Sequence, residues 1–434
     1  MQRTHYSSQI KPEMNGQPVI VSGWAHEIRD FGGISFLILR DREGLIQITM
    51  PKKKVSAEII DAVRGLSRES VVSVGGTVKA EAKAPHGYEL IPTEIEVLSM
   101  ADAPLPLDPT GKVPAELDTR LDARYMDLRS PNVTAVFVIR ARAIKAIRDF
   151  LSANGCLEIA TPKIVATATE GGTALFPIAY FDREAFLNQS PQLYKQMMMA
   201  AGMDRVYEVG PIFRAEEHAT RKHLNEATSI DVELSFVSME DVMVLLENAI
   251  AYTYTYVKEN CARELQELGI DLQVPKTPFR RVPYAEAIAI AKANPDCAQI
   301  EYGDDFDSTA EHAIGAAIGE HYFIMDWPTE LRAFYTQAYD DHPELCKAFD
   351  LMHPRMELSS GAQREHRHAK LVRNLEDRDL TPENFTFYLD AFRYGMPPHA
   401  GWGLGAERLI QTMLNLNNVR EAVLFPRDRV RLTP

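Results

Sequence analysis

Four prolines close to one another divide the chain into two unequal parts. They are Pro104, Pro106, Pro109 and Pro114, in the segment ADAPLPLDPTGKVP. Proline lacks a backbone N–H and fixes φ, so this segment cannot be a helix or a central strand. A chain of 434 residues is also too long for one ordinary core. We therefore expect a first domain at 1–104, a linker or hinge at 105–133 and a second domain at 134–434.

The first part has the pattern of a small β-barrel. Short β-branched runs alternate with turns between Val19 and Met100, namely VIVSGWAHEI, SFLILRD, LIQIT, VVSVGGTV and YELIPTEIEVL. A helical pattern interrupts them once, near Val55 to Leu66. Five strands and one helix suit a five-stranded barrel of the OB-fold type.

The second part mixes strands and helices. VYEVGPIFRAE, ATSIDVELSF, HYFIMDW and AFDLMHPRMEL have strand patterns, whereas FTFYLDAFRYG and ERLIQTMLNL have helical ones. One amphipathic helix has the stripe Phe137, Ala141, Ile144, Ile147 and Leu151, and stops at Asn154-Gly155. Because strands mostly follow strands, we expect an antiparallel sheet flanked by helices. The chain as a whole is then an α+β protein.

Composition excludes several classes of protein. A formal net charge of -14 argues against nucleic-acid binding over the whole surface, so any RNA contact must be confined to one face. We find no signal peptide and no apolar run that could span a bilayer, and therefore expect a cytoplasmic protein without a membrane partner. The four cysteines lie far apart, which favours buried free thiols over a zinc site or a disulfide framework.

Three segments resemble the signature motifs of class II aminoacyl-tRNA synthetases. The helix and the strand-like LEIATPKIV, which contains Pro162, resemble motif 1, the dimer interface of that family. FRAEEHATRKHLNEATSIDVE (Phe213 to Glu233) resembles motif 2, two strands joined by a loop, and GWGLGAERL (Gly401 to Leu409) resembles motif 3, a strand leading into a helix. Taken singly, each fits a packed helix, a charged hairpin or an ordinary glycine turn. Their combination in this order is specific.

This resemblance implies an ATP site. In motif 2, Arg214 would hold the α-phosphate and the substrate carboxylate, because a planar, permanently charged fork suits both oxyanions. Glu216 would accept from the adenine amino group, and His223 would approach the terminal phosphates. In motif 3, Arg408 would clamp the γ-phosphate or cover the adenine. Arg214 and Arg408 are therefore the expected catalytic residues.

The resemblance also implies a magnesium site. In FDLMHPRMELSSGAQRE, Asp350 and Glu357 match the metal-binding carboxylates of the family, with Ser360 beside them. Magnesium needs only one or two carboxylates when substrate phosphates supply other ligands, so Glu357 would also contact ATP. Without the surrounding motif, two acids at this spacing would more often face solvent.

Specificity for aspartate is implied by other segments. In QSPQLYKQ, Gln192 would contact the backbone groups of the substrate and Lys195 its side-chain carboxylate, which Arg364 of SGAQREHR would also bind. Two cations reject asparagine, whose neutral amide leaves a desolvated charge uncompensated. Glu170, in the glycine-rich TEGGTALF, would face the substrate ammonium from a closing loop. The full expected aspartate site is Glu170, Ser190, Gln192, Lys195, Arg214, Asp231, Ser360 and Arg364.

The first domain resembles an anticodon-binding barrel. In RDFGGISFLILRDREGLIQ, Phe36 would stack on the central anticodon uridine, while Arg29 and Gln47 would bond to base edges. A phenylalanine in a strand is more often a core residue. The RDREG run (Arg40 to Gly44) and LDTRLDARYMDLR (Leu117 to Arg129) strengthen the resemblance.

The chain is thus identified as a member of the class IIb aspartyl-tRNA synthetases, of the archaeal and eukaryotic type because a bacterial insertion between motifs 2 and 3 is missing. The resemblance implies a homodimer that activates L-aspartate with ATP and Mg²⁺ and charges tRNA(Asp). The alternatives are an asparaginyl-tRNA synthetase, which Lys195 disfavours, and a non-catalytic RNA-binding paralogue, which would not need the three motifs. Lys222 stands where arginine is usual and Ala227 where several relatives have an adenine-stacking aromatic.

Two further positions bear on the choice of tRNA. Relatives that discriminate between tRNA(Asp) and tRNA(Asn) have tryptophan and lysine at the positions of His26 and Pro85. The smaller pair removes the lysine donors and leaves room for either third anticodon base. This predicts a non-discriminating enzyme that also charges tRNA(Asn), with an aspartyl-tRNA amidotransferase acting downstream. The alternative is that both residues only shape turns.

Overall fold

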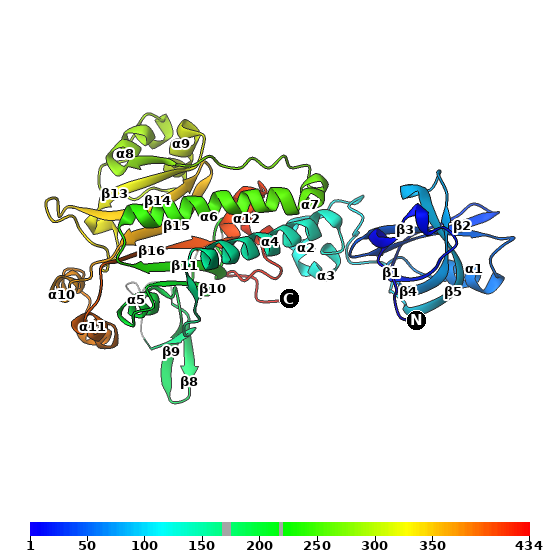
Figure 1. Ribbon diagram of the computed structural model, residues 1–434, viewed down its shortest axis with the longest axis horizontal. Coiled ribbons are helices and arrows are strands. Elements are labelled where there is room, and N and C mark those ends of the chain that lie inside the picture. Colours follow the sequence, from blue (N-terminus) through cyan, green and yellow to red (C-terminus); the bar gives the residue numbers. More distant parts are fainter. Residues whose placement is uncertain (167–174, 217–219) are drawn as a thin grey trace. The chain divides into compact units, whose positions relative to one another are not determined.

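The computed structural model describes residues 1–166, 175–216 and 220–434. These residues form two compact units, Met1–Glu116 and Leu117–Pro434 (Figure 1). The boundary lies inside the segment 105–133 that we expected to be the linker, but the end of that segment is not a free hinge. It forms α2 (Leu117–Asp122) and α3 (Arg124–Asp127). The buried Arg124 guanidinium donates to the carbonyl oxygens of Val423 and Leu424, at 2.9 and 3.0 Å, which fixes these helices to the second unit.

The first unit is a closed five-stranded barrel, as expected, with the strand order β1-β2-β3-β5-β4. Its elements are β1 (Pro18–Asp30), β2 (Ile34–Asp41), β3 (Gly44–Pro51), α1 (Ala57–Arg64), β4 (Val71–Ala80) and β5 (Tyr88–Ser99), with the short 3-10 turns η1 (Ser7–Gln9), η2 (Pro12–Met14) and η3 (Pro85–Gly87). Alternate residues of each strand, such as Leu37 and Leu39, fill the interior.

The RDREG run has a structural role in this barrel. Arg40 and Glu69 form a buried ion pair, with Nη2 and Oε2 2.6 Å apart. Asp41 accepts from the backbone N and the hydroxyl of Ser7, both at 2.7 Å. A Cβ on Gly23 would lie 2.1 Å from the carbonyl oxygen of Arg40, so only glycine lets β1 approach this close.

The second unit is built on an eight-stranded sheet in the order β12-β13-β14-β15-β16-β11-β10-β6. The strands are β6 (Leu157–Glu158), β10 (Arg205–Phe213), β11 (Glu226–Ser235), β12 (Arg280–Pro283), β13 (Tyr322–Pro328), β14 (Leu345–His353), β15 (Met356–Gln363) and β16 (His399–Gly405). The interior pairs are antiparallel, as expected, but β12–β13 and β10–β6 at the two edges are parallel. The sheet is therefore mixed. A separate three-stranded sheet contains β7 (Ile164–Val165), β9 (Arg183–Leu187) and β8 (Pro177–Tyr180).

Two long helices, α4 and α6, lie side by side against one face of the large sheet (Figure 1). The helices of this unit, besides α2 and α3, are α4 (Pro131–Ala153), α5 (Gln192–Ala200), α6 (Met239–Asn260), α7 (Ala262–Glu267), α8 (Tyr284–Lys292), α9 (Ser308–Ile318), α10 (His368–Glu376), α11 (Thr386–Arg393) and α12 (Ala406–Met413), with 3-10 turns η4 (Pro295–Cys297), η5 (Thr329–Leu331), η6 (Pro382–Phe385) and η7 (Val419–Ala422). In α4 the buried stripe includes Ile139 and Ala143, whereas Ala141 is exposed, so the expected stripe was misplaced at its beginning.

The strand-like LEIATPKIV is mostly not a strand. Only its ends pair, as β6 and β7, and Pro162 lies between them. The four cysteines are buried free thiols, as expected. Among the described helices, none combines the length and apolar character needed to cross a bilayer.

Candidate active site

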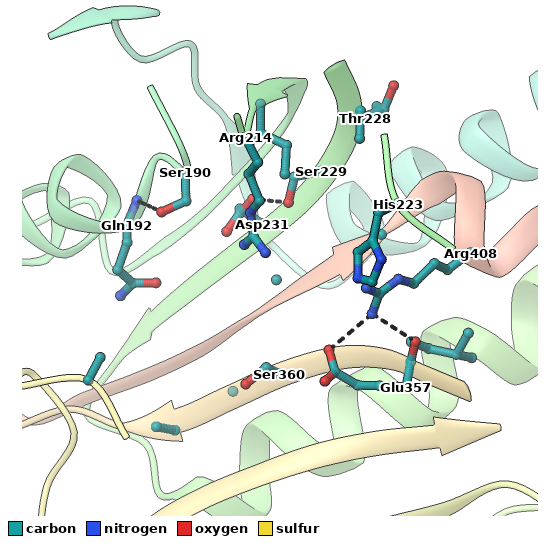
Figure 2. A pocket seen from close by; sticks show the side chains of 18 of the residues that line it. Ser190, Gln192, Arg214, His223, Thr228, Ser229, Asp231, Glu357, Ser360 and Arg408 are labelled. Carbon is teal, nitrogen blue, oxygen red and sulfur yellow. Dashed lines mark hydrogen bonds and ion pairs between the residues drawn. The ribbon is translucent and has the colours of Figure 1, made fainter. Parts of the chain in front are cut away.

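A cavity of about 440 Å³ is lined by residues of β11, β15, β16 and α12. Alternation along β11 explains which side chains reach it. Ile230 and Val232 pack into the helix-covered core, so Ser229 and Asp231 face the cavity. The expected residues that line it are Ser190, Gln192, Arg214, Glu216, His223, Asp231, Glu357, Ser360, Arg364 and Arg408, several of which are labelled in Figure 2. The structure therefore brings motifs 2 and 3 together. Glu170 lies outside the described residues.

Motif 2 is an antiparallel hairpin of β10 and β11. Asn225 and Arg214 are paired where the two strands meet the connection between them. The backbone carbonyl of Asn225 accepts from Arg214 N at 3.0 Å, and the side-chain amide of Asn225 donates to Arg214 O at 2.9 Å. The Arg214 side chain is exposed and lines the cavity (Figure 2). No described residue forms a hydrogen bond or ion pair with its guanidinium, so this fork is available for an oxyanion.

His223, Arg408 and Glu357 meet at one end of the cavity (Figure 2). Arg408 Nη1 donates to the carbonyl oxygen of Glu357 at 3.2 Å and lies 3.5 Å from Oε1 of its carboxylate. Burial and the positive charge of Arg408 lower the pKa of His223, which keeps its imidazole neutral at neutral pH. Two cations, Arg408 and the nearby Arg214, thus serve a cavity of a size suited to a nucleotide.

Motif 3 brings two strands unusually close together. A Cβ on Gly401 would lie 2.1 Å from the carbonyl oxygen of Val232, so only glycine lets β16 approach β11 this closely. Glu407, at the start of α12, accepts from Thr228 N at 2.9 Å and from Arg140 at 2.7 Å. These bonds join motif 3 to motif 2, and Glu407 lines the cavity together with Ala227 and Glu216.

The expected metal ligands lie on β14 and β15, where Asp350 pairs directly with Ser360. Arg332 donates to both carboxylate oxygens of Asp350 and stacks 3.7 Å above the ring of Trp327. Burial raises the pKa of Asp350 to about 6 in spite of this arginine, and the charge of Glu357 adds to the shift. Asp350 is therefore the less accessible of the two carboxylates.

Glu357 and Ser360 are the more open donors. The Glu357 side chain is 34% exposed, and both residues line the cavity. In the described part of the chain, no three His, Cys, Asp or Glu side chains converge as a closed metal site would require. Magnesium in nucleotide sites needs only one or two carboxylates besides phosphate oxygens. The residues present therefore fit Mg²⁺, with Glu357 as the accessible carboxylate.

Lys195 lies behind the cavity wall and is only 1% exposed. Its Nζ donates to Asp231 Oδ1 at 2.9 Å and to the carbonyl oxygens of Trp402 and Val232 at 3.1 and 3.3 Å. An ammonium has three donors, so all of them are already used. The expectation that Lys195 offers a donor to the substrate is not met in this arrangement.

Arg364 reaches the cavity from the end of β15. Its Nε and Nη2 donate to the two carboxylate oxygens of Glu233 at 2.9 and 3.2 Å, and Nη2 lies 3.4 Å from Gln192 Oε1. Nη1 has no hydrogen-bond partner among the described residues. Nε2 of Gln192 is buried and likewise unpartnered there, and Gln192 N donates to Ser190 Oγ at 3.3 Å. These donors can hold a carboxylate ligand.

Sequence reasoning missed Glu233 and Arg332. Glu233 is fully buried between Arg364 and Lys195, whose Nζ lies 3.5 Å from Oε2. Lys195, Arg364, Asp231 and Glu233 therefore form a charge-balanced cluster, not the doubly positive site expected. The period-two spacing of Asp231 and Glu233 on a strand was the signal that could have found the second acid. Arg332 lies in a connection without a comparable pattern.

In the first unit, the expected anticodon residues share one outer face. Arg29 pairs with Phe36 across β1 and β2, and Gln47 pairs with Ile38, two residues further along β2. Phe36 packs edge-on against Phe31, whose side chain is 68% exposed. An aromatic side chain with polar neighbours suits single-stranded RNA.

His26 lies within β1, whereas Pro85 lies on the connection between β4 and β5. His26 occupies the irregularity in the β1–β2 pairing, and its Nδ1 accepts from Arg40 at 3.0 Å. Burial and Arg40 lower its pKa, which leaves it neutral. Pro85 is exposed and begins η3, between β4 and β5.

Comparison with known families matches both units. Residues 116–429 match the family described as tRNA synthetases class II (D, K and N). Residues 19–98 match the OB-fold nucleic acid binding domain family. The first match covers nearly all of the second unit, including the cavity, and the second covers the barrel.

Similar proteins are found among both curated and solved proteins. The aspartate–tRNA(Asp/Asn) ligase of Methanoculleus marisnigri is 61% identical over 98% of each chain, and that of Methanosarcina barkeri is 59% identical over 100% of this chain and 99% of its own. Among solved structures, the asparaginyl-tRNA synthetase of Pyrococcus horikoshii complexed with asparaginyl-adenylate matches with a TM-score of 0.94, at 32% identity over 100% of both chains. The aspartyl tRNA synthetase of Entamoeba histolytica matches with a TM-score of 0.88, at 30% identity over 99% of this chain and 92% of its own. The chain belongs to the class II tRNA synthetases and, within them, to the archaeal aspartate–tRNA(Asp/Asn) ligase family.

Proposed function

We propose that this enzyme activates L-aspartate with ATP and transfers it to the 3′ end of tRNA(Asp), and also of tRNA(Asn). The observation that carries the proposal is the cavity itself. Arg214 and Arg408 supply cations for a triphosphate, while Arg364 and Gln192 leave unpartnered donors for an amino-acid carboxylate. Whole-length relatives at 59–61% identity bear the name aspartate–tRNA(Asp/Asn) ligase, which supports the same reading.

In the first step, an oxygen of the aspartate α-carboxylate attacks the α-phosphorus of ATP in line. Its bond to phosphorus forms as the bond to the leaving pyrophosphate breaks, giving aspartyl-adenylate. Arg214 would neutralise the α-phosphate and Arg408 the outer phosphates, with Glu216 at the adenine end. Positioning and charge neutralisation carry such a reaction, so no protein nucleophile is needed.

Magnesium would be held by Glu357 with Ser360, and Asp350 would complete the expected set. When bound, it supplies positive charge to the phosphate oxygens. Arg332 would control the access of the metal to Asp350, because it already uses both oxygens of that carboxylate.

In the second step, the terminal ribose 3′-hydroxyl of the tRNA attacks the activated carbonyl carbon and AMP leaves. The barrel would select the tRNA, with Phe36 stacked on the central anticodon base and Arg29 and Gln47 at base edges. The negative charge of the whole chain does not oppose this, because the contact is confined to one face.

An asparaginyl-tRNA synthetase is the second candidate, favoured by the TM-score of 0.94. Similarity of the fold does not distinguish an asparaginyl from an aspartyl enzyme, since an aspartyl tRNA synthetase also matches, with a TM-score of 0.88. The buried ion pairs support aspartate, because Lys195 neutralises Asp231 and Arg364 neutralises Glu233 while Nη1 of Arg364 keeps no partner among the described residues and is open to a carboxylate. A non-catalytic paralogue would not need this cluster or the cations of the cavity.

Exchange of labelled pyrophosphate into ATP tests the proposal. We expect exchange that depends on aspartate and is not supported by asparagine. Exchange supported by asparagine alone would establish the second candidate. Absence of exchange with either amino acid, in protein that binds tRNA, would establish the non-catalytic one.

Relaxed tRNA specificity is proposed from His26 and Pro85, neither of which presents a long cationic side chain. The test compares aminoacylation of purified tRNA(Asp) and tRNA(Asn). We expect similar kcat/KM values. A preference for tRNA(Asp) of about a hundredfold, which is about 2.7 kcal/mol, would refute the proposal. If it holds, an amidotransferase must convert aspartyl-tRNA(Asn) to asparaginyl-tRNA(Asn) in the same cell.

We also propose a homodimer that works in the cytoplasm, where charged tRNA is consumed. β6 is an edge strand of the large sheet, and the side chains of Leu157 and Ile164 on either side of Pro162 are exposed. Apolar side chains at a sheet edge suit burial against a second copy. A monomer in sedimentation at micromolar concentration would contradict the dimer.

A further inference from the structure

Lys222 and Glu311 join two segments that are far apart in the sequence. Lys222 lies in the motif 2 connection just before β11, whereas Glu311 lies on α9. Lys222 Nζ is 2.7 Å from Glu311 Oε2 and donates to Ser308 Oγ at 3.2 Å. Both side chains of the ion pair are largely buried, and only Lys222 lines the cavity.

Glu311 is fixed relative to the wall that carries Glu357. A Cβ on Gly315 would lie 2.1 Å from the carbonyl oxygen of Pro354, so α9 packs backbone to backbone against the β14–β15 turn. Asp307 caps α9 by accepting from the backbone N of Thr309 and Ala310, at 2.9 and 2.8 Å. The helix is therefore a firm support for the Glu311 carboxylate.

The lysine end is also ordered. Thr220 Oγ1 accepts from Lys222 N at 3.2 Å and lies 2.7 Å from His223 Nδ1. Arg420 donates to the carbonyl oxygen of Thr220 at 2.9 Å. Thr220 thus joins the backbone of Lys222 to the imidazole of His223, its neighbour at the end of the cavity where Arg408 lies.

We propose that Glu311 is a positioning residue for ATP, which holds the Lys222 ammonium where the outer phosphates bind. The inference rests on the proposed function, since ATP is the ligand. Glu311 and Ser308 use two of the three ammonium donors, and the described residues leave the third for a phosphate oxygen. Lysine binds phosphate as a point charge, so the arginine usual at this position is not required.

Three variants test whether Glu311 acts through Lys222: Glu311→Gln, Lys222→Met and the double variant. The assay is aspartate-dependent ATP–pyrophosphate exchange at fixed free Mg²⁺. We expect Glu311→Gln to raise the KM for ATP about fivefold or more, with the KM for aspartate within about twofold of wild type. The double variant should be no worse than Lys222→Met alone, because the two changes remove one interaction. An unchanged KM for ATP, or additive losses, would overturn the proposal.

A charge swap separates positioning from simple stabilisation. Lys222→Glu with Glu311→Lys restores an ion pair but turns a carboxylate toward the phosphates. We expect it to recover the unfolding temperature lost in Lys222→Glu, but not the KM for ATP. Recovery of both would show that the pair is only structural. Asp390→Asn, which breaks the exposed pair of Asp390 with Arg393 on α11, is the matched control.

The variant Ser308→Ala and exchange by the wild-type enzyme distinguish failure of this inference from failure to fold and from failure of the proposed function. If Glu311→Gln does not fold, Ser308→Ala removes a single acceptor of Lys222 and should raise the KM for ATP by a smaller factor, whereas no rise would overturn the proposal. Absence of exchange in the wild type would instead defeat the proposed function. Normal wild-type exchange with an unaffected Glu311→Gln variant would defeat this inference alone.

Discussion

Lys195 and Asp231 form a buried ion pair in which Nζ lies 2.9 Å from Oδ1. The remaining donors of the lysine bind backbone carbonyls of β11 and β16, so one side chain ties α5 to two strands of the sheet. Asp231 also accepts from Ser229 Oγ at 2.5 Å and is one of the residues on the cavity wall. Lys195 therefore shapes the amino-acid site from behind instead of entering it.

We expect Lys195→Met to abolish aspartate activation while largely sparing ATP binding. The variant leaves Asp231 without its cation and Glu233 with only Arg364, and breaking a buried pair costs about 3–5 kcal/mol. Aspartate-dependent exchange and separately measured ATP binding provide the readouts. Normal exchange in this variant would show that the buried pair has no part in aspartate selection.

Arg364→Leu should have the same effect for a different reason. It removes the unpartnered Nη1 from the cavity and leaves the fully buried Glu233 without its bidentate partner. We expect kcat/KM for aspartate to fall by a factor on the order of a thousand, or about 4 kcal/mol. Arg364→Lys keeps the charge but not the fork, and should recover only part of this loss. Full recovery would mean that charge alone is recognised.

A buried histidine should contribute to acid sensitivity. Burial lowers the pKa of His321 from its ordinary 6.5 to about 3, and its Nε2 has no partner among the described residues. A lowered folded-state pKa means that the unfolded chain takes up the proton first as the pH falls. The stability conferred by the neutral ring is complete above pH 6.5 and is lost from there down to about pH 3.

His321→Phe tests this linkage. Protonation of His321 in the unfolded chain lowers the free energy of unfolding of the wild type by about 2 kcal/mol at pH 5. His321→Phe has no histidine at this position and should not show this loss. Denaturant unfolding at pH 7 and pH 5 measures the difference, with a substitution at the exposed His86 as control. Equal losses in wild type and His321→Phe would show that another group is responsible. The ring stacks on Phe279 at 5.3 Å, so an aromatic replacement keeps the packing.

Patterns that depend on local periodicity predicted the fold well. The barrel strands, α1 and the motif 2 hairpin follow from alternation and turn residues. The parallel edge pairs were missed, because β6 has two residues and β12 has four, too few to show a pattern. The end of the linker was missed because the burial of Arg124 depends on residues near the C-terminus.

The site shows the same limit. The continuous segments of motifs 2 and 3 supply expected residues that line the cavity, namely Arg214, Glu216, His223, Asp231 and Arg408. Lys195 and Asp350 were also expected to bind ligands and are not among the lining residues. The partners that neutralise those residues come from elsewhere in the chain, as with Arg332 on Asp350 and Glu233 on Arg364. Charge balance is a property of the folded arrangement. Residue type alone predicted two cations, Lys195 and Arg364, whereas the structure pairs each of them with a buried acid.

The structure indicates how the barrel could accommodate a bulkier residue at position 26. His26 Nδ1 accepts one hydrogen bond from Arg40, and Arg40 is held independently by both oxygens of Glu69 at 3.0 and 2.6 Å. Tryptophan offers no acceptor, so His26→Trp loses that bond, at a cost of about 1 kcal/mol. The Arg40–Glu69 pair should remain in place. Pro85 is exposed, and a lysine there needs no repacking.

The double variant His26→Trp/Pro85→Lys should therefore fold and become selective for tRNA(Asp). Tryptophan reduces the room beside the third anticodon base, and lysine adds a directional donor, so one base is favoured and the other excluded. We expect the ratio of kcat/KM for tRNA(Asp) over tRNA(Asn) to rise about tenfold or more, equivalent to about 1.4 kcal/mol. ATP–pyrophosphate exchange needs no tRNA and should not change, which separates lost specificity from lost folding. An unaltered ratio in a variant with normal exchange would mean that His26 and Pro85 only shape their turns, and that the third base is read by other residues of the barrel.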